Sequence, residues 1–390
     1  MRRNWFLLAL TLCILLAGYL AVSLGRVSTR TEDYDLKVEA ARRTERCFQA
    51  VRELKQARGI AIDYASDINA TGMIGPDFSL ITTTLGNLES KRTSTNPNMA
   101  AVLIDMFGEL GLEPGDTVAI NCSGSFPSLN IATICAAETM GLEPVLISSF
   151  GASTHGANDP DFTYQDMEAH LYDLGLISTK SAYFSIGGNL DIGTEMGAEV
   201  KQAIVARLEG LGYAFIYDED LIRNVRDRYA FYREGRDVKC FINVGGNDVC
   251  FGDSSVMVHA GGGILTELAE KDHSIGLIQL FLADHIPVIH LLNVKTLAAD
   301  YGLPIDPSPI PAPGSGGVYY STRYNRPLAA AALLLALLPW GCMCAARAGR
   351  GAKRLPAGTN KKGRVLRAAP GLFAYSPSRT VRFRPAALAR

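Results

Sequence analysis

Two long apolar segments near the ends of the chain constrain its fold more than any other feature. The first, Trp5 to Leu24, contains no charged residue and follows Arg2 and Arg3. At a rise of about 1.5 Å per residue, a helix of this length reaches roughly 30 Å, the thickness of a bilayer core. We predict an uncleaved N-terminal membrane anchor over residues 1–26. A cleavable signal peptide is the alternative, although no clear A-x-A cleavage site follows.

The second apolar segment, Leu328 to Ala346, is rich in alanine and leucine and ends at Arg347. It is barely long enough to cross a bilayer, and a buried core helix is the alternative interpretation. From Arg347 onward there are 12 Lys and Arg residues and no acidic residue, and positive flanks remain cytoplasmic. The sequence therefore predicts a second transmembrane helix over 327–346. Both termini would be cytoplasmic, with the main domain on the outer face of the cell membrane.

The net charge of −1 conceals a basic tail attached to an acidic body. Outside the tail, residues 347–390, the chain has 26 Lys and Arg residues against 39 Asp and Glu residues. The tail lacks helical or strand periodicity, so we expect it to be disordered. Its aromatic residues are sparse and it contains no nucleic-acid-binding module, so we expect no nucleic-acid partner.

Cysteine usage says little about function. Five cysteines lie outside the apolar segments, and their spacing does not repeat: Cys47, Cys122, Cys135, Cys240 and Cys250. A disulfide framework is therefore not expected, and a single disulfide bond is the alternative. The chain has no CxxC motif, which argues against a cysteine zinc site.

Short β-rich stretches alternate with helical patterns between the apolar segments. Thr117–Asn121 and Pro144–Ile147 are expected to be strands around a helix at Leu129–Met140, which is a βαβ unit. Later strands are expected in SAYFSIGG, YAFIYDED, VKCFINVGGND and IPVIHLLN, and later helices at Gly197–Leu211 and in SIGLIQLFLADH. We predict an α/β domain over 112–326 with a doubly wound, mostly parallel sheet.

A helical, membrane-proximal segment is predicted over 27–111. Its first helix, Asp35–Lys55, has apolar residues at helical spacing among many charges, as an amphipathic helix does. A second helix is expected at Met99–Leu110.

Four of the predicted strands pass directly from β-branched or aromatic residues into Gly, Ser and Asn. Their sequences are INCSGSF, LISSFGAS, FSIGGNLD and FINVGGND. The carboxyl ends of parallel strands meet at one edge of a sheet, and ligands bind in the crevice there. Small residues let backbone N–H groups approach a ligand, so we predict a binding crevice. The alternative is that these glycines only serve turns that need positive φ. Neither GxxxxGK[ST] nor GxGxxG is present, and no cofactor is expected.

The polar loop from Ser148 to Glu168 is expected to form one wall of this crevice. The candidate ligand-binding residues are polar or small residues of the strand ends and one lysine: Lys91, Ser125, Ser153, His155, Asn158, Asp159, Gly187, Gly188, Asp191, Gly245 and Gly246. Lys91 is the candidate cation for an acidic ligand, with a solvated run of charges as the alternative.

Catalytic and metal-binding roles are further hypotheses. Ser123, Ser125 and Ser153 are candidate nucleophiles or anion-binding hydroxyls, but no GxSxG elbow surrounds any of them. His155, Asp159 and Asp161 could form a hard metal site with Asp166 or Asp191. We favour turns before Pro160 and a helix cap at Thr163 and Asp166 instead, and no metal is predicted. His259, His285 and His290 lie in apolar stretches and are expected to be packed.

The motifs GDTVAINCSGSFPSLNIA, SSFGASTHGANDPDFTYQDME, FINVGG and IPVIHLLN…YGLPIDP together resemble the poly-γ-glutamate system protein family. Members are membrane-anchored proteins associated with bacterial poly-γ-glutamate capsule synthesis. The resemblance covers roughly residues 5–326 and implies a role in this pathway at the cell envelope. It brings no characterised active site.

Three functions follow as hypotheses. The first is an accessory component of capsule synthesis or export that binds polymer, precursor or a synthase subunit. The second is an amide hydrolase or acyl-transfer enzyme of the same pathway that uses Ser123 or Ser125. The third is a structural scaffold for the synthase complex.

Overall fold

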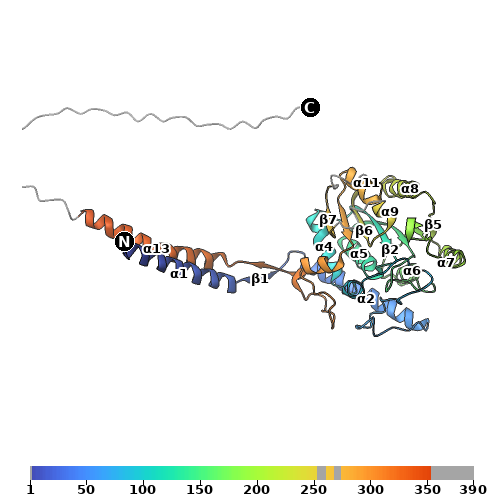
Figure 1. The fold of residues 1–390 in the computed structure, drawn as a ribbon, viewed down its shortest axis with the longest axis horizontal. Helices are drawn as coiled ribbons and strands as arrows, with labels where there is room; N and C mark the ends of the chain where they lie inside the picture. The colour runs from blue at the N-terminus through green and yellow to red at the C-terminus, as the bar shows by residue number, and fades with distance from the viewer. Residues whose placement is uncertain (1, 253–260, 268–273, 353–390) are drawn as a thin grey trace, which may run out of the picture. The chain divides into compact units, whose positions relative to one another are not determined.

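The computed structural model describes residues 2–252, 261–267 and 274–352, and the chain forms two compact units. One unit contains the two terminal helices, and the other comprises Gly25–Asn325 (Figure 1). Most of the predicted tail, residues 353–390, lies outside the described residues, as does His259. Residues 347–352 belong to a helix, so the prediction that disorder begins at Arg347 is wrong for these six positions.

The terminal unit consists of α1 (Arg2–Leu24) and α13 (Arg326–Ala352), which lie side by side (Figure 1). A Cβ atom on Gly18 would lie 2.7 Å from Cβ of Ala332, so glycine permits this close approach. The indole N–H of Trp340 donates a hydrogen bond of 3.0 Å to the Thr11 hydroxyl across the pair.

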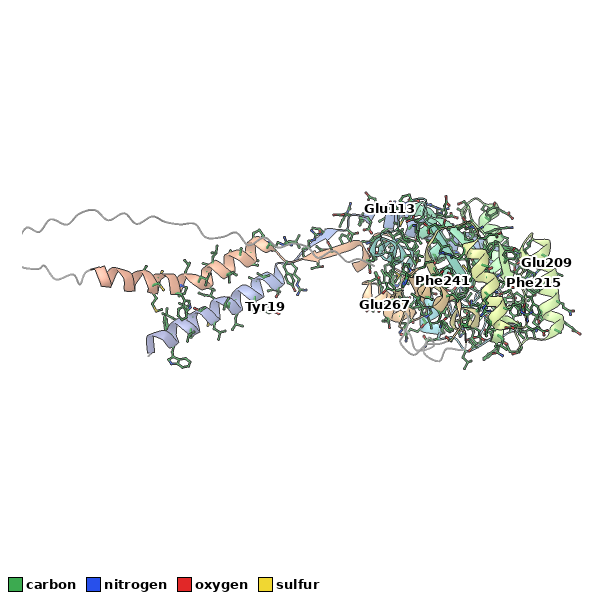
Figure 2. All side chains as sticks on the ribbon, turned by 90° about the horizontal axis from the view of Figure 1, so that it is seen from above. Tyr19, Glu113, Glu209, Phe215, Phe241 and Glu267 are labelled. Carbon is green, nitrogen blue, oxygen red and sulfur yellow. The ribbon has the colours of Figure 1, made fainter. Side chains whose placement is uncertain are left out.

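Both terminal helices are long and apolar enough to cross a membrane, over Trp5–Leu24 and Arg326–Ala345. Their apolar side chains are largely exposed within this unit, as Tyr19 on α1 illustrates (Figure 2). The two apolar helices predicted from the sequence are therefore present.

The second unit is built on a seven-stranded sheet in the order β5-β4-β3-β2-β6-β8-β7. Its strands are β2 (Thr117–Ser123), β3 (Glu143–Ser149), β4 (Tyr183–Ser185), β5 (Ala214–Phe215), β6 (Val238–Val244), β7 (Gly263–Leu265) and β8 (Val288–Leu291). All neighbouring pairs are parallel except β7 and β8. The structure confirms an α/β fold with a mostly parallel sheet.

The strand order reverses at the centre of this sheet. From β2 the chain moves outward through β3, β4 and β5, and it then returns to place β6 on the other side of β2. The loops that leave β2 and β6 therefore run to opposite sides, which opens a crevice between them at the carboxyl edge.

Alternate residues of β2 belong to different cores. Val118 and Ile120 pack in a core with residues of α2, α4 and α5, whereas Ala119 packs in another with residues of α8, α9 and α11. Helices therefore cover both faces of the sheet (Figure 1). Phe241 of β6 is fully buried in the second core (Figure 2).

The helices of this unit are short to medium in length. They are α2 (Tyr34–Ala57), α3 (Leu88–Ser94), α4 (Met99–Glu109), α5 (Pro127–Met140), α6 (Tyr164–Asp173), α7 (Ala198–Gly210), α8 (Leu221–Arg233), α9 (Asp248–Phe251), α11 (Leu277–Ala283) and α12 (Val294–Asp300). The described residues also include two 3₁₀ turns, η1 (Asn189–Asp191) and η2 (Gly317–Tyr319). Because α2 and α4 share a core with α5, the segment 27–111 belongs to the same compact unit as the sheet.

Local sequence explains why α5 lies where it does. Pro127 occupies its first turn, where a missing N–H costs nothing. Gly141 ends it in the left-handed conformation at φ 76°. Between these points nearly every residue is apolar or small, so the helix is buried along most of its length. Its start follows β2 directly and places Ser123 and Ser125 at the sheet edge.

A two-stranded antiparallel ribbon closes the unit. It pairs β1 (Val27–Arg30) with β9 (Tyr320–Arg323), the first and last elements of the unit. The chain therefore enters and leaves this unit at one place.

The strands and helices expected from sequence are present, with bounds shifted by a few residues. The antiparallel edge strand β7, the helix α8 and the ribbon were not predicted. His290 is buried as expected, whereas His285 is exposed, so the expectation of a packed side chain is wrong there. The cysteines are free thiols, with the Sγ atoms of Cys47 and Cys135 3.7 Å apart in the core.

Candidate functional site

A cavity of about 310 Å³ lies at the carboxyl edge of the sheet, where the strand order reverses. We call it the crevice. Residues from the ends of β2, β3, β4 and β6 and from the segment before α3 line it: Thr83, Thr84, Ser123, Ser125, Gly151, Gly188, Asn189, Gly246, Asn247, Asp248 and Phe251. Each of the four strand ends singled out in the sequence thus contributes at least one residue.

The predicted site residues divide into two groups. Ser123, Ser125, Gly188 and Gly246 line the crevice. Gly187 and Gly245 lie one position before these glycines, with positive φ values of 77° and 86° that turn the backbone at the strand ends. The remaining candidates, Lys91, Ser153, His155, Asn158, Asp159 and Asp191, do not line it.

The part of the crevice that follows β4 and β6, which we call the rim, consists of residues 188–189 and 246–248. Gly246 and Asn189 are exposed, Gly188 and Asp248 are partly covered, and Asn247 is buried. Asp248 Oδ2 accepts a 2.7 Å hydrogen bond from the Leu190 N–H, which ties the two halves of the rim together. Burial raises the pKa of Asp248, and the nearby negative charge of Asp191 adds to this rise.

The loop from Ser148 to Glu168, which we call the wall, is mostly buried. Only Gly151 of this loop lines the crevice. Asn158 is fully buried, and its side-chain amide donates to the Pro76 carbonyl at 2.9 Å and to the Thr82 hydroxyl at 3.0 Å. These bonds fasten the wall to the segment before α3.

Other polar residues of the wall have equally structural surroundings. His155, at φ 61°, pairs with the exposed Asp77 through Nε2 at 2.8 Å. Asp159 accepts a 3.0 Å bond from the Asp161 N–H, as expected for a turn. Among the described residues no group of three or more possible metal ligands comes together.

The predicted helix cap at the end of the wall is present. Asp166 accepts a 2.8 Å bond from the Thr163 N–H, and together they form the capping box of α6. Asp166 is also paired with Arg58 at 3.2 Å and Arg207 at 2.9 Å. The cap therefore joins α2, α6 and α7.

A row of buried polar side chains crosses the sheet next to the crevice. Asn121, Asn243 and His290 are register partners on β2, β6 and β8, and all three are fully buried. Asn243 Nδ2 contacts His290 Nδ1 at 3.1 Å and also donates to the Gly245 carbonyl at 2.8 Å. Burial lowers the pKa of His290 to about 4, so the imidazole is neutral at pH 7.

Arg228 of α8 connects this row to the rim. Its guanidinium donates to Asp191 at 2.5 Å and to Asn224 at 2.7 Å, and it reaches Asn121 at 3.4 Å. Arg228 and Asp191 are 1 % and 2 % exposed. Asp191 is therefore the root of the rim, since it holds the turn that carries Asn189 in place.

Lys91 lies behind the crevice, buried at 2 % exposure. Its ammonium group contacts the Ser125 carbonyl, the Ser153 hydroxyl at 2.7 Å and the face of Phe126 at 4.0 Å. No carboxylate of the described residues forms an ion pair with it. Burial lowers the pKa of Lys91 to about 7.

Several functional positions could not be singled out from the sequence. Thr83 and Thr84 come from a stretch with no periodic pattern, and Arg228 lies on a helix that was not predicted. Asn121 and Asn243 did carry a signal, since each is a polar residue within an otherwise apolar strand. Comparisons of the chain with models of known protein families, with curated proteins and with solved structures found no match.

Proposed function

We propose that this chain is a membrane-anchored component of poly-γ-glutamate capsule synthesis or export that binds the polymer, or a precursor of it, in the crevice. The observation that carries the binding role is a cavity lined by hydroxyl, amide and backbone groups where the strand order of the mostly parallel sheet reverses. The pathway rests on the motif resemblance described above.

The lining of the crevice favours the amide bonds of such a polymer over its carboxylates. None of the described residues that line it is Lys, Arg or His. Thr83, Ser123 and Ser125 offer hydroxyl donors for a carbonyl oxygen, and Asp248 offers an acceptor for an amide N–H. The free α-carboxylates of the polymer would then remain in water at the rim.

This recognition mode has a measurable consequence. A basic groove that binds a polyanion loses affinity steeply as salt increases, because surface charges are screened within about 8 Å at physiological ionic strength. Binding through amide groups should depend only weakly on salt. It should also distinguish γ-linked from α-linked glutamate, because the spacing between successive amides differs.

The proposed location is the cell membrane, with both termini in the cytoplasm and the α/β unit outside. Two helices of sufficient length and the basic residues from Arg347 onward support it. A reporter fused after Arg390 should be active only in the cytoplasm, and one inserted near Asn96 only outside. A tail reporter that works only outside would contradict the two-span arrangement.

The binding proposal is tested with the full chain in detergent micelles. γ-Linked glutamate oligomers should bind more tightly than α-linked oligomers of equal length, as measured by calorimetry at two salt concentrations. Asn189→Ala should weaken this binding, and Asp237→Ala, an exposed site outside the crevice, should not. Equal binding of both linkages, or affinity that collapses with salt, would rule out the amide-reading crevice.

A further inference from the structure

The contacts around Lys91 are unusual for a buried lysine. Lys37 is also fully buried, but it is paired with Asp33 at 3.1 Å and with Asp105. Lys91 has two oxygen contacts and no described carboxylate partner. A buried ammonium without a counter-charge is costly, so the neutral amine is favoured.

Two glycines make the approach of Lys91 to Ser125 possible. A Cβ atom on Gly86 would lie 2.9 Å from Cε of Lys91 and 3.1 Å from the Ser153 hydroxyl. A Cβ atom on Gly156 would lie 2.9 Å from the Ser125 carbonyl oxygen. Larger residues at either position would push these segments apart.

Ser125 joins this buried group to the crevice. It is half-buried and lines the cavity. Its hydroxyl oxygen accepts a 3.0 Å bond from the Ser153 N–H, and its own N–H donates to the Ser123 hydroxyl at 3.1 Å. The hydroxyl of Ser125 is therefore held by the backbone N–H of Ser153, and the side-chain hydroxyl of the same Ser153 contacts the Lys91 amine.

We propose that Ser125 is a nucleophile for an amide or ester carbonyl bound in the crevice, and that Lys91 receives its proton through the Ser153 hydroxyl. Serine nucleophiles served by a lysine instead of a histidine are a known variant of this chemistry. A lysine whose pKa is near 7 can accept a proton at neutral pH, as this role requires. The inference uses the crevice of the proposed function, but it does not depend on the identity of the polymer.

The reaction balances without a further reactant except water. Ser125 Oγ bonds to the carbonyl carbon while its proton moves to Ser153, and the Ser153 proton moves to the Lys91 amine. The C–N bond then breaks, and the amine leaves with the proton returned along the same path. Water attacks the resulting ester by the same route, which releases the acid and restores Ser125.

The test uses the full chain in detergent micelles and a fluorophosphonate, which traps activated serines. Mass spectrometry should find one adduct at Ser125, with a rate that rises as pH increases through about 7. Lys91→Met should slow labelling about 100-fold or more. Lys91→Arg should also slow it, because an arginine retains the charge but cannot accept a proton.

Lys55 provides the matched control. It is 5 % exposed and donates to the carbonyls of Gly72 and Ile74, but it does not line the crevice. Lys55→Met should therefore label at the wild-type rate. No adduct at Ser125 overturns the proposal, as does labelling that Lys91→Met leaves unchanged. If Lys91→Met does not fold, a wild-type labelling rate that is flat from pH 6 to 8 overturns it instead.

Because the probe is not a glutamate polymer, the result is independent of the binding experiment. Labelling without polymer binding would refute the proposed ligand and retain the nucleophile. Polymer binding without labelling would do the reverse. Release of p-nitroaniline from γ-glutamyl p-nitroanilide, lost in Ser125→Ala, would extend the result from probe to amide.

Discussion

The wall and the rim share several polar residue types but differ in environment. Both contain Gly, Asn and Asp, and both follow strands of the same sheet. In the wall, Asn158 is fully buried and uses its amide to hold backbone. In the rim, Asn189 is exposed and lines the crevice, and its side-chain N–H donates to the exposed Thr194 hydroxyl at 2.9 Å. Polar composition at a strand end therefore indicates hydrogen bonding, but it does not say whether the partner is the protein or a ligand.

The difference has a topological cause. The wall follows β3, and a neighbouring segment, residues 75–86, covers it through backbone bonds such as Thr83 N–H to the Ala152 carbonyl at 2.9 Å. The rim follows β4 and β6, which lie on opposite sides of the β2–β3 pair, so no single segment spans it. Polar groups that are covered must find protein partners, and those left open remain available.

The largest expected effect is at the root of the rim. Asp191→Ala leaves Arg228 buried without its carboxylate, and it should lower the free energy of unfolding by about 3–5 kcal/mol. Urea titration followed by far-UV circular dichroism measures this. Asp237→Ala, which removes an exposed pair with Lys239, is the matched control and should cost less than about 1 kcal/mol. Equal losses of stability in the two variants would mean that the Asp191–Arg228 pair does not anchor the rim.

The next prediction concerns pH and tests whether water is excluded from the buried row of Asn121, Asn243 and His290. The folded pKa of His290 is about 4, below its ordinary value of 6.5. Between these values the unfolded chain binds one more proton than the folded chain, so this residue makes stability fall as pH decreases from 6.5 to 4. The slope reaches about 1.4 kcal/mol per pH unit. The stability of wild type minus that of His290→Gln, measured against pH, should show this slope. Parallel stability profiles of the two proteins would mean that the imidazole is solvated.

The wall should respond to truncation through stability. Asn158→Ala removes the donor to the Pro76 carbonyl and the Thr82 hydroxyl, and each stranded group costs about 1–3 kcal/mol. A thermal melt of the full chain should show a clear decrease in Tm. A variant that melts like wild type but binds ligand poorly would place Asn158 in the site after all.

The smallest stability change is expected at the tip of the rim. Asn189 is exposed, so Asn189→Ala should change the free energy of unfolding by less than about 0.5 kcal/mol. Its effect should appear in ligand affinity instead. Parallel melts and calorimetry on this variant and Asn158→Ala separate the two regions directly, and the comparison fails if both variants lose stability together.

Periodicity predicted most of the sheet because the apolar strands are short, distinct and separated by helices. β2 and β6 carry an apolar pattern on both faces, so they are recognisable as central strands. β7 has three residues and pairs antiparallel, so it is too short to show a period, whereas β5 was expected in YAFIYDED although it has only two residues. α8 has charged residues on most of its faces, so its sequence does not distinguish the buried Arg228 from the other charged residues.

The site was predicted only in outline. Glycine, serine and asparagine at four strand ends indicated the edge of the sheet at which the crevice lies, since that follows from parallel topology. Which of them line the crevice depends on the segment that covers the wall, and this segment has no periodic signal. Lys91 could not be distinguished from a solvated lysine either, because its contacts with Ser125, Phe126 and Ser153 are made only in the folded chain, by residues distant from it in sequence.

The antiparallel ribbon of β1 and β9 has a mechanical consequence. The first and last residues of its register are Val27 with Arg323 and Arg30 with Tyr320, and the chain continues to the terminal helices from the Val27 end. Tension that separates those helices would therefore peel the ribbon open one hydrogen bond at a time, because antiparallel bonds lie perpendicular to the strands. The ribbon would yield at low force before any load reached β2 or β6.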